Sequence, residues 1–204
     1  MAGAFSSILL VGCGNMGGAM LAGWLAGGVE AGRFTVADPV LAEAPAGVRL
    51  LREVPDEIFD AVLIGVKPQI LGDVAGDIGR AVGKETIVFS ILAGVELETL
   101  SSLFPAASGI VRIMPNLAAA IGRSPMGLAS LGLDEVQREA VTALVAPLGA
   151  AEWLAEEALF DAVTALAGSG PAFVYRFIDA LAQGAQALGR PQDQAGRLAL
   201  ATVE

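Results

Sequence analysis

The sequence of 204 residues contains no histidine, one cysteine, one tyrosine and two lysines. Zinc sites of the usual Cys/His kind are therefore excluded, and no metal site is expected. Ser-His-Asp and Cys-His nucleophilic machinery is excluded for the same reason. Any chemistry must come largely from a bound cofactor. Because Cys13 has no partner for an internal disulfide, the sequence indicates a reducing compartment and predicts a cytoplasmic protein.

Positive charge is also scarce. The chain has 12 basic and 22 acidic residues, a net charge of −10, and its basic residues are scattered singly. Binding to nucleic acid requires a basic face that neutralises phosphates, and an anionic membrane surface attracts the same kind of face. The charge pattern argues against both partners, so a small-molecule substrate is expected.

Residues 8–29, near the N-terminus, carry no charge. A membrane span or a signal peptide is one interpretation. Seven glycines and Asn15 within the run, and no Lys or Arg before it, favour a soluble strand–helix unit instead.

The order of apolar segments predicts an α/β fold. Short runs rich in branched residues alternate with segments of helical spacing, which is typical of a doubly wound parallel sheet with both faces covered. The predicted strands are 6–12, 33–38, 60–66, 85–91 and 108–114, with 150–156 as a candidate last strand. After Glu156 the pattern is wholly helical. We therefore expect a Rossmann-type dinucleotide-binding domain over residues 1–155 and a helical domain over residues 156–204.

A glycine fingerprint follows the first predicted strand. Gly12-Cys13-Gly14-Asn15-Met16-Gly17 fits G-x-G-x-x-G and opens a helix. In such a motif Gly12 permits the tight turn, Gly14 lets the backbone approach a pyrophosphate, and Gly17 lets the helix pack on the strand. The helix N-terminus then offers N–H groups to phosphates. A merely structural glycine turn is the alternative.

Asp38 ends the second predicted strand, where a carboxylate can accept the hydroxyls of an adenosine ribose. A ribose 2′-phosphate there would be repelled, by roughly 1 kcal/mol per charge pair at ~4 Å in water. No Lys or Arg follows in "ADPVLAEA" to offset this repulsion. NADH is therefore expected to be tolerated or preferred. Alternatively, Asp38 only caps the turn at Pro39.

Three further stretches, "GVKPQ" (65–69), "VRIMPNLAAAIGRSPMGL" (111–128) and "DAVTALAGSGPAFVYRFIDALAQGAQALG" (161–189), together with "GCGNMG", resemble the pyrroline-5-carboxylate reductase family. The resemblance implies a Rossmann domain followed by an all-helical dimerisation domain, and hence a homodimer or higher homo-oligomer. It also implies reduction of L-1-pyrroline-5-carboxylate to L-proline by hydride from NADPH or NADH, the last step of proline biosynthesis. NADPH is the cofactor that the family often favours.

The resemblance also assigns cofactor and substrate positions. Val66, Lys67 and Pro68 would line the cofactor near its nicotinamide half, Ala93 and Gly94 would continue that wall, and Pro115 and Asn116 would border the nicotinamide. Glu157 matches a position associated with the substrate pocket. Each of the three loops follows a predicted strand, where α/β sheets bind ligands. Ordinary helix starts at Pro68 and Pro115, and an ordinary turn at Gly94, are the alternatives.

A second glycine-rich turn, residues 168–171, precedes a helix with few charges. Ser169 can cap that helix and Pro171 suits its first turn. We expect Ser169, Gly170 and Pro171 to present backbone and small side chains to the nicotinamide and the substrate. An iminium can arrive already protonated, so no catalytic acid is assigned. Structural capping alone is the alternative.

Two features leave the function open to test. Family members continue for several tens of residues and carry a "SPGGTT"-like loop for the substrate carboxylate, so we expect a C-terminally shortened, incomplete helical domain and poor turnover by this form. A non-catalytic dinucleotide-binding or sensing protein of the same fold is the alternative function. Another is a related imine or hydroxyacid reductase, but the hydroxyacid enzymes need an acid–base Lys or His, and residues 157–204 contain neither.

Overall fold

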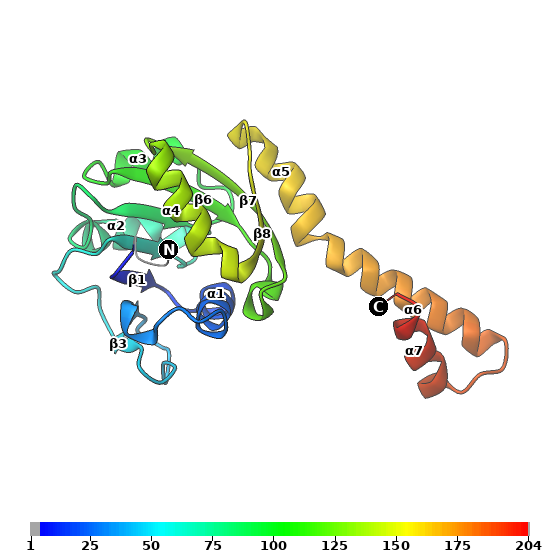
Figure 1. The fold of residues 1–204 in the computed structure, drawn as a ribbon. Helices are drawn as coiled ribbons and strands as arrows, with labels where there is room; N and C mark the ends of the chain where they lie inside the picture. The colour runs from blue at the N-terminus through cyan, green and yellow to red at the C-terminus, as the bar shows by residue number, and fades with distance from the viewer. Residues whose placement is uncertain (1–4, 204) are drawn as a thin grey trace. The chain divides into compact units, whose positions relative to one another are not determined.

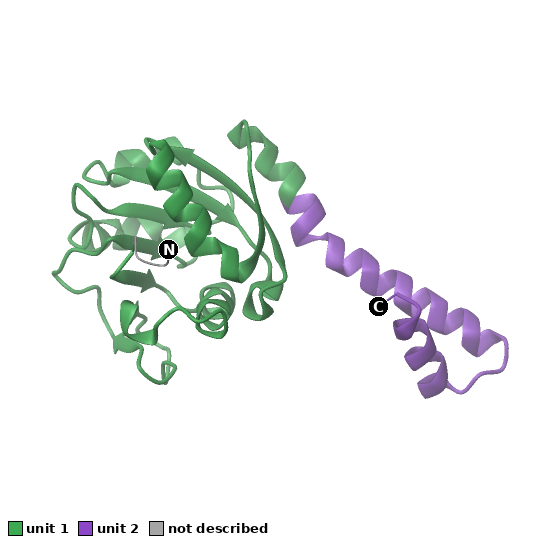
Figure 2. Cartoon of the chain, in the orientation of Figure 1, with its two compact units in different colours: residues 1–163 green, residues 164–204 purple. Residues whose placement is uncertain are grey.

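The computed structural model describes residues 5–203. By its internal contacts the chain divides into two compact units, residues 1–163 and residues 164–204 (Figure 2). We describe each unit by itself. The functional division into domains 1–155 and 156–204 stays a prediction.

Unit 1 is built on an eight-stranded sheet with the order β3-β2-β1-β4-β5-β6-β7-β8 (Figure 1). All neighbouring strands pair in parallel except β6 and β7. The predicted doubly wound α/β fold is therefore confirmed. The strands are β1 (Ile8–Val11), β2 (Phe34–Ala37), β3 (Arg49–Leu51), β4 (Ala61–Ile64), β5 (Ile87–Ser90), β6 (Gly109–Met114), β7 (Ser124–Leu131) and β8 (Gly149–Trp153).

The first strand lies where the winding of the sheet reverses. Ile8 is in register with Phe34 of β2 on one side and with Ala61 of β4 on the other. The chain thus leaves β1 toward one edge of the sheet and later returns to build the other half. In open α/β sheets, ligands bind at the carboxyl ends of the strands at this switch point.

Two strands are absent from the sequence-based prediction. The edge strand β3 has only three residues, too few to show a hydrophobic pattern. The strand β7 contains Pro125 and Gly127, two residues that are depleted in strands, and it runs antiparallel to β6. Both strands form because a neighbouring strand offers unpaired backbone groups, which is a tertiary effect.

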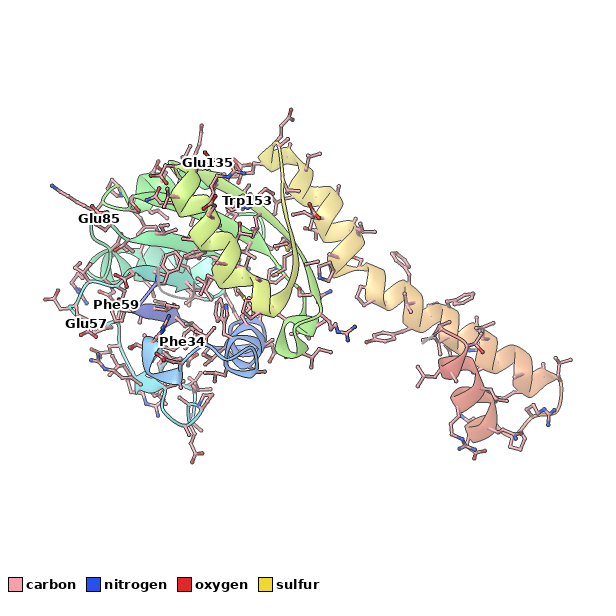
Figure 3. The ribbon with its side chains drawn as sticks, in the orientation of Figure 1. Phe34, Glu57, Phe59, Glu85, Glu135 and Trp153 are labelled. Carbon is pink, nitrogen blue, oxygen red and sulfur yellow. The ribbon has the colours of Figure 1, made fainter. Side chains whose placement is uncertain are left out.

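Helices cover both faces of the sheet and create two separate cores. The helices of unit 1 are α1 (Asn15–Ala26), α2 (Leu71–Gly79), α3 (Leu97–Leu103), α4 (Glu135–Val145) and α5 (Phe160–Val163). Alternate residues of one strand enter different cores: Leu10 joins the cluster of Trp24 and Phe34, whereas Leu9 joins the cluster that contains Phe59 (Figure 3). This two-sided burial explains why the strands read as continuous apolar runs.

Aromatic side chains secure the helices to the sheet. Trp24 of α1 stacks on Phe34 of β2 with ring centroids 5.5 Å apart, and its indole Nε1 donates to the carbonyl of Leu144 in α4 at 2.7 Å. At the opposite edge, Trp153 of β8 donates to the hydroxyl of Thr142 in α4 at 2.9 Å (Figure 3). The uncharged run 8–29 contains β1 and α1 of this packed unit, so the strand–helix interpretation of that run is confirmed.

Unit 2 is helical, as predicted. A π-helical turn (Thr164–Gly168) leads into α6 (Gly170–Ala187), and α7 (Gln192–Ala201) packs against α6. Its buried residues are mostly alanines: Ala182, Ala195 and Ala199 are at most 9% exposed. By length and composition alone, the stretch Glu157–Ala187 would be apolar enough to cross a membrane, with a mean hydropathy of 1.2.

Candidate functional site

The three glycines of the fingerprint each have the geometry that a dinucleotide site needs. Gly12 has a φ of +84°, a conformation that side chains rarely adopt. A Cβ on Gly14 would meet nothing within 4 Å, so this backbone faces open space. A Cβ on Gly17 would lie 2.8 Å from the carbonyl oxygen of Gly12, so only glycine lets α1 approach the turn. These are the separate tasks of turn, ligand approach and helix packing.

The N-terminus of α1 is open to a ligand. Its N-cap residue is Gly14, no side chain caps the helix, and its first turn contains no acidic residue. The first N–H groups of a helix have no partner within the helix and carry a partial positive charge. A pyrophosphate would supply the missing acceptors. The turn is held by the N–H of Gly12, which donates to the carbonyl of Ala37 at 2.9 Å.

Gly65, a glycine outside the fingerprint, lets the loops after β1 and β4 approach each other closely. Its N–H donates to the carbonyl of Val11 at 2.8 Å, and a Cβ on it would lie 2.7 Å from the carbonyl oxygen of Gly12. Conversely, a Cβ on Gly12 would lie 3.0 Å from the backbone of Gly65 and Val66. The loops after the two strands therefore meet backbone to backbone. Because neither Gly12 nor Gly65 has a side chain, neither residue fills the space above the switch point.

The other predicted cofactor residues lie at the same edge of the sheet, because they follow β4, β5 and β6, which are parallel. Lys67 is the exposed N-cap residue of the short helix η2 (Pro68–Ile70). Gly94 has a φ of +74°, and with Ala93 it forms an exposed turn. The structure thus brings these positions to the edge that also carries the glycine fingerprint.

Pro115 and Asn116 follow β6. Pro115 is buried, and the side-chain oxygen of Asn116 accepts the N–H of Ala118 at 3.0 Å, which caps η3 (Leu117–Ile121). The backbone N–H of Asn116 donates to the hydroxyl of Ser124 at 2.9 Å. Asn116 therefore fixes the loop at this end of the sheet. The same contacts are also consistent with the alternative that Pro115 only marks an ordinary helix start.

The carboxylate of Asp38 is engaged by the protein's own backbone. One oxygen accepts the N–H of Cys13 at 2.8 Å, and the other accepts the N–H groups of Val40 and Leu41, each at 2.9 Å. Burial opposes ionisation, but these N–H donors and the nearby Arg52 outweigh it and hold the pKa of Asp38 below its ordinary value. Asp38 thus caps its turn and also joins it to the glycine fingerprint.

Arg52 is the residue that the sequence argument missed. We expected no cation near Asp38, because none follows it in the chain, and this expectation is wrong. Arg52 lies just after β3, and its Nη1 donates to the carbonyls of Asp38 at 3.2 Å and Leu41 at 2.5 Å. The pairing of β2 with β3 brings it there. Because β3 is too short to show a strand pattern, no local signal in the sequence placed Arg52 beside Asp38.

A pocket of about 450 Å³ lies beside the fingerprint, a volume within the usual range for ligand sites. Gly12, Pro39 and Val66 from the loops after β1, β2 and β4 line it, with Arg52 and Arg80 as its cations. A pocket at the carboxyl ends of these strands is the place where an adenosine half of a dinucleotide fits. The glycine geometry, the open helix end and this pocket together fit such a cofactor.

The three side chains within the fingerprint contribute less to a ligand site than its backbone does. The thiol of Cys13 is buried, and burial, with the negative charge of Asp38, raises its pKa. A protonated, buried thiol is a poor nucleophile, so Cys13 acts through its backbone N–H. Asn15 is exposed at the start of α1 and Met16 is half-buried. Among the described residues, no group of three or more acidic or Cys side chains could hold a metal.

Glu157 lies in unit 1 and is part of an ion pair. Its Oε1 accepts a hydrogen bond from Nη1 of Arg112 on β6 and another from the N–H of Leu97, the first residue of α3, at 2.9 Å. The guanidinium of Arg112 also lies 4.4 Å from the ring centroid of Phe160. Glu157 therefore connects β6, α3 and the turn before α5. Its predicted place in the substrate pocket stays a prediction.

The structure corrects the interpretation of residues 168–171. Ser169 has helical dihedral angles and makes no side-chain capping hydrogen bond; its N–H donates to the carbonyl of Thr164 at 3.1 Å. The expected capping by its hydroxyl is therefore wrong, because the preceding residues are already helical. Pro171 does lie in the first turn of α6, and a Cβ on Gly170 would meet nothing within 4 Å. Small residues thus follow directly after the π-helical turn.

Comparisons with known proteins agree on one family. A family model described as pyrroline-5-carboxylate reductase dimerisation matches residues 157–204. The chain is 32% identical over 204 residues to the pyrroline-5-carboxylate reductase of Pseudomonas aeruginosa, covering 96% of this chain and 75% of that protein. The solved structure of a pyrroline-5-carboxylate reductase from Coxiella burnetii superposes with a TM-score of 0.87 at 26% identity, covering 97% and 77% of the two chains.

A further solved structure is the Plasmodium falciparum pyrroline carboxylate reductase with NADP bound. It superposes with a TM-score of 0.84 at 22% identity, covering 97% of this chain and 75% of that one. At this identity the match concerns the fold.

Proposed function

Because the chain belongs to the pyrroline-5-carboxylate reductase family, we propose that the carboxyl edge of its sheet holds a reduced nicotinamide dinucleotide beside a cyclic imine. The protein is an NAD(P)H-dependent oxidoreductase that reduces L-1-pyrroline-5-carboxylate to L-proline, in proline biosynthesis. The cofactor supplies the hydride. The single observation that carries the placement is the geometry of Gly12, Gly14 and Gly17 at the switch point.

The chain's own residues contribute positioning rather than acid–base chemistry. Gly14 and the uncapped start of α1 bind the pyrophosphate, and Val66, Lys67 and Pro68 border the cofactor after β4. Ala93, Gly94, Pro115 and Asn116 continue the wall toward the nicotinamide. Such positioning can lower a barrier by several kcal/mol without a proton-transferring side chain. Because the imine can arrive protonated, no group of the chain has to donate a proton to it.

Ser169, Gly170 and Pro171 of unit 2 are proposed to contact the substrate, as the family resemblance implies. Gly170 leaves open space and Pro171 lies at the start of α6, which suits a compact ring-shaped substrate. The hydroxyl of Ser169 makes no helix-capping hydrogen bond, so it can hydrogen-bond to the substrate. Glu157 of unit 1 is proposed to act indirectly, by fixing β6 and α3.

The protein is proposed to work as a homodimer through unit 2. The family model of residues 157–204 describes a dimerisation region. Within α6, Phe173 and Tyr175 are 72% and 71% exposed, and Val174 and Phe177 are also exposed. A helix with so many exposed apolar and aromatic side chains is typical of a protein interface. A second copy therefore accounts for the apolar character of Glu157–Ala187 better than a lipid bilayer does. Location in the cytoplasm stays a prediction.

The test is a steady-state assay of cofactor oxidation with L-1-pyrroline-5-carboxylate. We expect turnover that Gly14→Val abolishes, since its side chain would fill the space of the pyrophosphate. Gly76→Val on α2, where nothing lies within 4 Å of a Cβ, is the matched control. Cofactor binding without any imine reduction would favour a dinucleotide-binding protein without turnover.

A further inference from the structure

The pocket beside the fingerprint has one cation without a carboxylate partner. Arg80 forms an ion pair with Asp77 at 3.0 Å, so its charge is partly compensated. Among residues 5–203, no carboxylate lies within ion-pair distance of Arg52. Two carboxylates line the pocket: Asp77 pairs with Arg80, and Glu53 is exposed to solvent. The positive charge of Arg52 therefore remains available to bind an anion.

The guanidinium of Arg52 is held in place but only partly used. An arginine has five N–H donors. The two on Nη1 serve the carbonyls of Asp38 and Leu41, which leaves the N–H on Nε and the two on Nη2 with no acceptor in the described part of the chain. Anchoring one nitrogen fixes the plane of the group beforehand. The remaining donors form a fork of the kind that binds phosphate oxygens.

The nearby carboxylate does not compete for that role. Asp38 is only 6% exposed, and its oxygens already accept three backbone N–H groups. Proteins that select NAD place an acidic group on the ribose 2′-hydroxyl, whereas those that select NADP place an arginine near the 2′-phosphate. Here the acidic group is turned inward, toward Cys13, and the arginine lines the pocket.

We propose that Arg52 binds the 2′-phosphate of NADPH and makes this cofactor preferred over NADH. The inference rests on the proposed placement of a dinucleotide at this edge of the sheet. It reverses the expectation drawn from Asp38 in the sequence, because that expectation assumed an exposed carboxylate without a cation. The phosphate, which carries up to two negative charges, would accept charge-assisted hydrogen bonds from Nε and Nη2.

The experiment measures the dissociation constants of NADPH and NADH by isothermal titration calorimetry on the full chain. We expect the wild-type protein to bind NADPH at least about tenfold more tightly than NADH. Arg52→Gln should weaken NADPH by about tenfold to a hundredfold, the range for losing a charged hydrogen-bonding partner, and change NADH by less than about twofold. The fragments 2′,5′-ADP and 5′-AMP should show the same contrast.

The ratio of the two constants separates recognition from loop stability. Arg52 also holds the loop at residues 38–41, so a purely structural role would weaken both cofactors equally and leave the ratio unchanged, which would overturn the proposal. Arg49→Gln, which removes an equal charge three residues earlier, at the start of β3, should leave the ratio unchanged. Arg52→Lys keeps the charge and should give an intermediate ratio.

The wild-type protein alone separates this proposal from the proposed function. Binding of both cofactors with equal affinity, or tighter binding of NADH, would overturn the role of Arg52 and leave the reductase intact. Binding of neither cofactor would instead contradict the placement of the dinucleotide site.

Discussion

The carboxylate of Asp38, at the end of β2, accepts the backbone N–H of Cys13 in the glycine fingerprint at 2.8 Å. This bond joins two loops that are 25 residues apart and that both border the pocket. A third loop enters through Arg52, which donates to the carbonyl of Asp38. The shape of the adenosine side of the site thus depends on Asp38 being ionised.

The first prediction concerns acid stability. Burial acts against ionisation, but hydrogen bonds from backbone and serine donors hold the pKa values of Asp38 and Asp60 below the ordinary 3.8. A carboxyl group whose pKa is lower in the folded state stabilises that state above its unfolded pKa. This stabilisation should be lost as the pH falls below 3.8 and through the folded-state pKa values. Urea unfolding along a pH series would measure it.

Asp60→Asn provides the internal comparison for that series. It removes the charge that accepts N–H groups from Ser6 and Ser7, so the slope of stability against pH should become shallower. Asp56→Asn, at an exposed position, should leave the slope as it is. An unchanged slope in Asp60→Asn would contradict the assigned cause.

The second prediction concerns Gly23 in α1. A Cβ there would lie 2.0 Å from the carbonyl oxygen of Ala119 and 2.9 Å from the side chain of Leu148. Gly23→Ala should therefore lower the free energy of unfolding by about 1–3 kcal/mol, despite the better helix propensity of alanine. Gly76→Ala in α2 meets nothing within 4 Å and should raise it by up to about 1 kcal/mol. Chemical denaturation of both variants gives the comparison.

Opposite signs for these two substitutions are the expected result. Stabilisation by Gly23→Ala would show that α1 can move away from η3 at little cost. Because η3 follows Asn116, such a movement would also loosen the nicotinamide end of the site.

The third prediction tests whether Glu157 acts on the substrate or on the fold. The side chain of Arg112 is 7% exposed and that of Glu157 is 27% exposed. Glu157→Gln leaves the buried guanidinium without a countercharge, so unfolding should become easier by about 2–3 kcal/mol, below the 3–5 kcal/mol typical of fully buried pairs. Glu156→Gln, one residue earlier and exposed, should change stability by less than about 0.5 kcal/mol.

Kinetics complete that test. A raised KM for the imine with unchanged stability would place Glu157 in direct contact with the substrate instead of in the support of β6 and α3. Calorimetric binding of the cofactor should be unaffected by either variant, because neither residue lines the adenosine pocket.

The fourth prediction concerns assembly. Phe173→Asp places a charge among the exposed apolar side chains of α6 and should shift the protein from dimer toward monomer at micromolar concentration. Val136→Asp on α4 alters a side chain of similar exposure, 74%, and should not change the molar mass. Light scattering measures both. A monomeric wild-type protein would contradict the proposed dimer.

Several features of this protein follow from the sequence because they are local. The buried strands β1, β2, β4, β5 and β6 can be predicted because they are continuous apolar runs, since both faces of a parallel sheet are covered. The glycine fingerprint can be recognised in the sequence because its spacing reflects turn geometry over six residues. The family resemblance rests on such local motifs, and the comparisons confirm it.

Other features exist only in the tertiary structure, because they join residues that are distant in the chain. The pairing of β2 with β3 places Arg52 beside Asp38, 14 residues away, so the expectation of no cation near Asp38 was wrong. The folding of the short helix η5 (Glu157–Leu159) against α3 and β6 brings Glu157 to Arg112 across 45 residues. The short strand β3 forms because β2 offers it a ladder. Backbone pairing, which periodicity does not encode, decided where these charges meet.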